Sequence, residues 1–72
     1  MKSTSSSMLW LFNDIKQASI QEFNKLLNEA LYSSSRYFMK LFNRLYPNNS
    51  FTYHELLDLY DIFKSYSLRG EI

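Results

Sequence analysis

The side chains best suited to metal or acid–base chemistry lie in the last third of the chain. His54, the only histidine, stands one helical turn before Asp58, a spacing that suits a two-ligand contact with a metal ion. A stable zinc site needs roughly three or four ligands, and the sequence has no cysteine and no second histidine. Asp58 and Asp61 share one helix face without any sign of a cleft, so we interpret both as solvated carboxylates. We expect no metal site, and we interpret His54 as a surface residue.

The sequence offers no pattern for covalent catalysis or for cofactor binding. A serine nucleophile needs a neighbouring base and donors for the oxyanion, but the serines occur in a leading run, within a predicted helix or at helix caps. The single glycine, Gly70, excludes the glycine-rich loops that bind nucleotide phosphates. We therefore expect a protein without enzymatic activity and without a cofactor.

A row of cations is the remaining polar constellation. Arg36, Lys40 and Arg44 recur at steps of four residues, which places them on one face of a helix. Such a row can contact phosphates, and it defines one hypothesis, a small nucleic-acid-binding regulator. We favour a different interpretation, in which the row pairs across a helical hairpin with the acidic residues Glu55, Asp58 and Asp61. The net charge of +1 is too small to support a general attraction to nucleic acid.

The composition points to a small helical domain that is rich in aromatic residues. The chain has 72 residues, of which 18% are aromatic, and it contains many leucines but no valine, a balance that favours helices over sheets. We expect a single domain over residues 1–72, with a disordered serine-rich lead at residues 1–7. The apolar run at residues 8–12 is too short for a signal peptide or a membrane span, so we expect a cytoplasmic protein.

Helical periodicity predicts the elements that carry these residues. Residues 8–46 contain no proline or glycine, and their apolar side chains follow a stripe of nearly heptad period, which predicts a long helical arm. Pro47 ends this arm, and a capping box at Thr52 and Glu55 begins a second helix over about residues 53–68. Because the connection is short, we expect an antiparallel helical hairpin in an all-α fold.

Two places can interrupt the long arm. Ser19 and Glu22 form a second capping-box pattern, so a break near residue 18 would fold residues 8–17 back and give a small three-helix bundle. The serines at residues 33–35 lower helix propensity, and we regard them as the weaker candidate for a break. Gly70 is expected to end the second helix in the left-handed conformation.

The two arms of the hairpin differ in length, which leaves apolar surface without a neighbour. In the hairpin, the second helix covers roughly residues 28–44, so the apolar residues that precede this range remain open. A third helix, a second copy of the chain or a different protein can cover them. We take this face as the candidate partner-binding surface, and its residues are Leu9, Trp10, Phe12, Ile15, Ile20, Phe23 and Leu27.

These observations favour a protein–protein interaction module. The leading hypothesis is an adaptor, co-chaperone or inhibitor that places its apolar-aromatic face in the groove of a partner. In size and outline the chain resembles small helical-hairpin proteins that act with a larger partner, such as needle-subunit co-chaperones of type III secretion and phage-encoded inhibitors of host enzymes. The alternatives are the nucleic-acid-binding regulator and a self-associating helical bundle.

Overall fold

The computed structural model describes residues 8–70 and consists there of four helices and no strand. Helix α1 spans Leu9–Ala18, α2 spans Ile20–Tyr32, α3 spans Ser35–Leu45 and α4 spans Tyr53–Arg69. The all-α fold is confirmed, and α4 matches the helix predicted after the turn. The serine-rich lead at residues 1–7 lies outside the described residues, as do residues 71–72.

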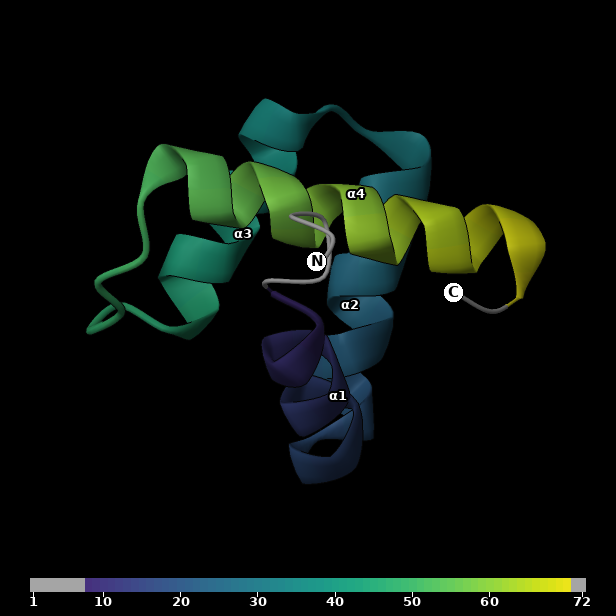
Figure 1. The fold of residues 1–72 in the computed structure, drawn as a ribbon, viewed down its shortest axis with the longest axis horizontal. Coiled ribbons are helices and arrows are strands. Elements are labelled where there is room, and N and C mark those ends of the chain that lie inside the picture. The colour runs from purple at the N-terminus through teal and green to yellow at the C-terminus, as the bar shows by residue number, and fades with distance from the viewer. Residues whose placement is uncertain (1–7, 71–72) are drawn as a thin grey trace, which may run out of the picture.

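Helix α4 lies across the other helices of the bundle (Figure 1). Helices α1 and α2 pack side by side and run in opposite directions, while α4 contacts α1, α2 and α3. The radius of gyration is 11.2 Å, close to the value of about 11 Å expected for a compact domain of this length. The predicted long arm is therefore folded into three helices that share one partner, α4.

Serines interrupt the predicted arm at two places. Between α1 and α2, Ser19 has an extended backbone, and its hydroxyl accepts a hydrogen bond from the Glu22 N–H at 3.3 Å. Between α2 and α3, Ser33 and Ser34 are also extended, so the weaker candidate for a break is present as well. Short polar side chains compete with the helical backbone at both places. The described chain therefore has four helices where the sequence predicted two or three.

Helix α4 begins and ends at the signals that predicted it. The Thr52 hydroxyl accepts a hydrogen bond from the Glu55 N–H at 3.2 Å, and the Glu55 carboxylate accepts one from the Thr52 N–H at 2.8 Å. At the other end, Gly70 has a φ of +81°, and its N–H donates to the Tyr66 carbonyl at 2.7 Å. These caps satisfy backbone groups that the ends of a helix leave unpaired.

Phe63 of α4 lies at the centre of the core and contacts all three other helices. Its ring centroid lies 4.8 Å from that of Phe12 in α1, 5.3 Å from that of Phe23 in α2 and 5.5 Å from that of Phe38 in α3. All four rings are buried. Aromatic pairs at these separations attract one another beyond the effect of burial alone. One aromatic side chain from each helix thus builds a continuous core.

The first part of the arm adopts one of the three arrangements that could cover it, the third helix. Because the break at Ser19 lets α1 fold back along α2, Phe12 and Ile15 enter the core together with Phe23 and Leu26 of α2. The third helix considered in the sequence analysis therefore exists, and it packs against α2 and α4. Among the described residues of α1 and α2, a few large apolar side chains stay exposed, and Trp10 is one of them.

Candidate functional site

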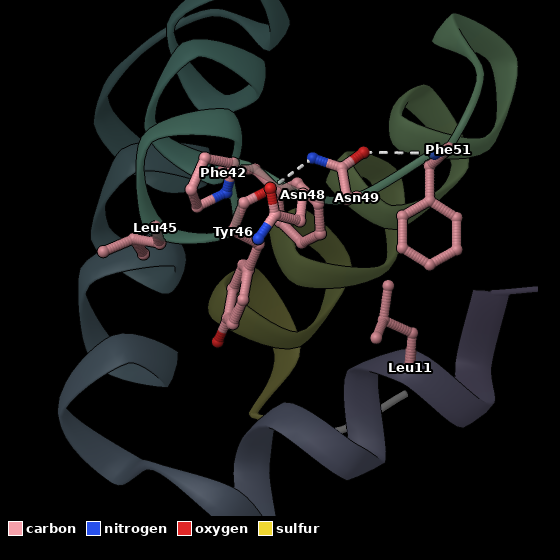
Figure 2. A pocket seen from close by; sticks show the side chains of 8 residues that line it. Leu11, Phe42, Leu45, Tyr46, Asn48, Asn49 and Phe51 are labelled. Carbon is pink, nitrogen blue, oxygen red and sulfur yellow. Dashed lines mark hydrogen bonds between the residues drawn. The ribbon is translucent and has the colours of Figure 1, made fainter.

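A groove opens between α1 and the loop that joins α3 to α4 (Figure 2). Leu11 of α1 and Phe51 of the loop face one another across it. The cavity has a volume of about 410 Å³, and none of the residues that line it is charged. We call it the loop groove. Its other lining residues come from the end of α3 and from the loop, and they are Phe42, Leu45, Tyr46, Pro47, Asn48 and Asn49.

Asn49 fixes the wall that the loop contributes to the groove. Its side-chain Nδ2 donates hydrogen bonds to the Asn43 Oδ1 at 2.8 Å and to the Tyr46 carbonyl at 2.7 Å. Its Oδ1 accepts a hydrogen bond from the Phe51 N–H at 3.1 Å, which is the pattern of an Asx-turn. These bonds hold the wall in place before any ligand binds, which lowers the entropic cost of binding.

Aromatic rings line the groove and continue to the molecular surface at Trp10. The Phe42 ring centroid lies 5.0 Å from that of Tyr46 and 6.0 Å from that of Phe51. The Phe51 ring in turn lies 6.2 Å from Trp10, the only tryptophan, which is 55% exposed. An indole that is half in water and half against an apolar wall is typical of residues that dominate binding surfaces.

Tyr46, one of the residues that line the groove, joins the end of α3 to the first turn of α2. Its hydroxyl donates a 2.5 Å hydrogen bond to Glu22 Oε1. Burial raises the pKa of Tyr46 above its ordinary value, and the hydrogen bond to Glu22 and the negative charge of that carboxylate raise it further. Because the phenol stays protonated at neutral pH, Tyr46 acts as a structural support for the groove.

Three of the predicted partner-binding residues belong to the core of the chain itself. Phe12, Ile15 and Phe23 are at most 3% exposed. A partner cannot reach these side chains while the bundle is folded. Heptad spacing placed them on the correct apolar face, but spacing does not distinguish a face covered by the same chain from one covered by another protein.

The other four predicted partner-binding residues are wholly or partly accessible. Leu9 and Leu27 are half-buried and pack against the core. Trp10 and Ile20 are 55% and 58% exposed. Of these two, Trp10 makes a tilted ring contact with the groove residue Phe51, whereas Ile20 begins α2 and is not among the residues that line the groove. Trp10 is therefore the predicted residue that the fold places at a candidate site.

The predicted cation row lies on the outer face of α3. Arg36, Lys40 and Arg44 are all exposed, and the Lys40 Nζ lies 5.8 Å from the centroid of the Tyr37 ring. Their expected partner Glu55 uses one carboxylate oxygen to cap α4. The three cationic side chains are therefore accessible to solvent.

His54 is exposed, and its ring lies against that of Tyr53, with 5.7 Å between the centroids. Over residues 8–70, no group of three or more histidine, cysteine, aspartate or glutamate side chains is placed to hold a metal ion. In the same range, no helix combines the length and the apolar character needed to cross a membrane.

Sequence reasoning missed the contribution of the loop to the site. It treated the connection after Pro47 only as the short link between two helices, and it gave Asn49 and Phe51 no role in binding. The spacing of Asn49 two residues before Phe51 is a usable signal, since an Asx-turn bonds the backbone at that distance. The contact between Glu22 and Tyr46 spans 24 residues and has no local signal.

Comparison of the chain with protein-family models, with curated proteins and with solved structures gives no match in any of the three.

Proposed function

We propose that this chain is a non-enzymatic, cytoplasmic interaction module that binds a partner protein through the loop groove and Trp10. The observation that carries the proposal is the half-exposed Trp10, whose ring lies in tilted contact with that of Phe51 at the edge of a preformed apolar groove. Exposed aromatic surface beside an apolar hollow is a feature of binding sites more than of inert protein surface.

The groove suits a large apolar side chain carried by a helix or an extended segment of the partner. Its lining is uncharged, and its volume of about 410 Å³ is within the range of ligand pockets. Asn48 lines the groove and is exposed, so its amide can bond the backbone of an incoming segment. An apolar centre with a polar rim is the usual arrangement of a protein interface.

Because its aromatic core is closed, we infer that this chain is already folded when it binds its partner and does not fold upon binding. Phe63 and the three rings around it are buried within the chain, so the core does not need a partner to be covered. An adaptor, a co-chaperone and an inhibitor all act in this way, by occupying a surface of the partner without chemistry. The partner is a different protein or a second copy of this chain.

Capture from the native host tests the proposal when it compares three matched baits. We expect the wild type and Ile20→Ala to retain the same partner, and Trp10→Ala to retain at least about tenfold less, because interface tryptophans carry a large share of binding energy. Ile20 is the matched control, since its exposure of 58% is close to the 55% of Trp10. Equal capture by Trp10→Ala and the wild type would contradict the assignment of the site.

A second variant and a second measurement complete this test. Leu11→Gln places a polar amide in the groove and should also reduce capture, while circular dichroism verifies that each bait is folded. If the partner is a second copy, sedimentation of the wild type shows a dimer that Trp10→Ala converts to monomer.

A further inference from the structure

The outer face of α3 concentrates positive charge. Arg36, Lys40 and Arg44 are exposed and follow one another by about 6 Å along the helix axis. The helix has no acidic residue anywhere along its length, so nothing on α3 itself neutralises the row. Such a series of cations at regular steps is an electrostatic footprint for a polyanion.

Two surface hollows flank the cation row, and both include Lys40. The first has a volume of about 550 Å³ and the second about 310 Å³. Besides Lys40, the first is lined by Ser34, Ser35, Arg36, Met39, Asn43 and Tyr53. The second is lined, besides Lys40, by Glu29, Tyr37, Leu41 and Arg44. Because the two hollows meet at Lys40, we name them together the α3 face.

Each hollow also presents an exposed tyrosine ring. Tyr53 in the first is 62% exposed, and Tyr37 in the second is 55% exposed. The Lys40 ammonium lies 5.8 Å from the Tyr37 centroid, within the range of a cation–π contact. Rings placed beside cations offer bases a surface to stack on while the cations bind the phosphates.

We propose that the α3 face binds single-stranded nucleic acid. Bases can stack on Tyr37 and Tyr53 only when they are not stacked inside a duplex, so the tyrosines should favour single strands. Arg36, Lys40 and Arg44 supply the phosphate contacts. The α3 face shares no lining residue with the loop groove, so substitutions can test the two surfaces separately.

Acidic side chains near the row oppose the attraction of a polyanion. Glu55, one of the expected partners, has a carboxylate oxygen committed to the cap of α4. Among the residues that line the α3 face, Glu29 is the only acidic one, and it comes from α2. Glu29 should therefore oppose binding of a polyanion. A variant that removes this charge should bind more tightly, whereas the other variants should bind more weakly.

Fluorescence anisotropy with a labelled oligothymidylate of about 15 nucleotides tests the proposal. We expect a dissociation constant in the micromolar range at low salt. Replacing Arg36, Lys40 and Arg44 by Gln should abolish most of the binding and reduce the slope of log K against log salt by about 2, at about 0.7 per phosphate contact. Glutamine keeps a helix propensity close to that of arginine and lysine, so α3 should remain folded.

Matched variants distinguish binding at the α3 face from attraction by positive charge elsewhere on the protein. Replacing Lys16, Lys25 and Arg69 by Gln removes the same charge from α1, α2 and α4 and should weaken binding far less. Tyr37→Ala or Tyr53→Ala should weaken it at least about fivefold through lost stacking. Glu29→Gln should strengthen it.

The proposal is overturned by any of four results. The first is no binding of the oligonucleotide at about 100 μM protein, which is far above the expected dissociation constant. The second is an equal loss of affinity in the two triple variants. The third and fourth are an affinity for a duplex of the same length, or for poly-glutamate, that equals the affinity for the single strand. The last result would identify a surface for acidic proteins instead of nucleic acid. Trp10 emission should stay unchanged on titration, since Trp10 belongs to the loop groove and not to the α3 face.

Discussion

The hydroxyl of Tyr46 donates a 2.5 Å hydrogen bond to the carboxylate of Glu22, and this contact joins the start of α2 to the wall of the loop groove. In a complete capping box, the Glu22 carboxylate would instead bond the Ser19 N–H. That N–H already donates to the Ile15 carbonyl at 3.0 Å, because Ser19 also ends α1. The carboxylate is therefore available to Tyr46. One serine that serves two helices makes a long-range contact possible.

Tyr46→Phe should destabilise the bundle by about 1 to 2 kcal/mol, because it removes a hydrogen bond to a charged acceptor at a partly buried site. Urea unfolding followed by circular dichroism measures the change. Tyr32→Phe is the control, since Tyr32 is 80% exposed and its loss should cost less than about 0.5 kcal/mol. Equal stability of Tyr46→Phe and the wild type would show that the contact contributes nothing.

The same pair predicts a loss of stability at alkaline pH. The pKa of Tyr46 is raised in the folded chain, by burial first and by Glu22 second, above its ordinary value of about 10. Below about pH 10, the phenol is protonated in both states and its contribution is fully present. Above that pH, the unfolded chain releases the proton while the folded chain retains it, so the contribution falls as pH rises.

The stability difference between the wild type and Tyr46→Phe should therefore be larger at about pH 8 than at about pH 11. Titrating lysines affect both proteins alike and cancel in this comparison. A difference that stays constant or grows with pH would refute the assigned direction of the shift.

Removal of helix caps should distinguish three serine and threonine positions. Thr52→Ala should cost about 1 to 2 kcal/mol, because it breaks the reciprocal box, and Ser19→Ala about 1 kcal/mol, because one bond is lost. Ser34 precedes α3 but makes no side-chain capping bond, so Ser34→Ala should cost less than about 0.5 kcal/mol. Thermal unfolding followed by the circular dichroism of the helices ranks the three losses of stability. A loss in Ser34→Ala equal to that in Thr52→Ala would be inconsistent with these caps.

Core and groove substitutions should separate stability from binding. Phe63→Ala should cost about 3 to 5 kcal/mol, since it removes the ring that contacts Phe12, Phe23 and Phe38. A domain of this size has little more stability than that to lose, so we expect it to be largely unfolded. Trp10→Ala should cost less than about 1 kcal/mol, because its side chain is half-exposed. Calorimetry of both variants checks this contrast, which would be wrong if Trp10→Ala also unfolded the chain.

The sequence contains local signals for most of the helix ends. Thr52 with Glu55, Ser19 with Glu22 and the position of Gly70 all depend on residues within one turn, so their roles could be predicted. The break at Ser33 and Ser34 was judged the weaker one because each serine lowers helix propensity only slightly. There, packing of α3 against α2 and α4 outweighs local propensity.

The candidate site was predicted only in part, because its elements meet through tertiary packing. Trp10 is exposed, as a partner-binding residue must be, whereas Phe12 and Phe23 were expected at the binding surface and lie in the core. Their burial depends on the angle at which α1 folds back along α2. The periodic spacing of apolar residues does not predict this angle. The groove itself requires the loop wall held by Asn49, which lies far from α1 in the sequence.

Photo-crosslinking from position 10 tests the central claim most directly. A photoreactive benzoylphenylalanine in place of Trp10 keeps an aromatic ring at the groove, and the same residue in place of Ile20 or Leu68 provides controls at positions 58% and 67% exposed. We predict a discrete crosslinked protein from position 10 in the native host, suppressed by excess unlabelled wild type but not by Trp10→Ala. No product from position 10, or the same product with equal yield from positions 20 and 68, would contradict the loop groove as the binding site.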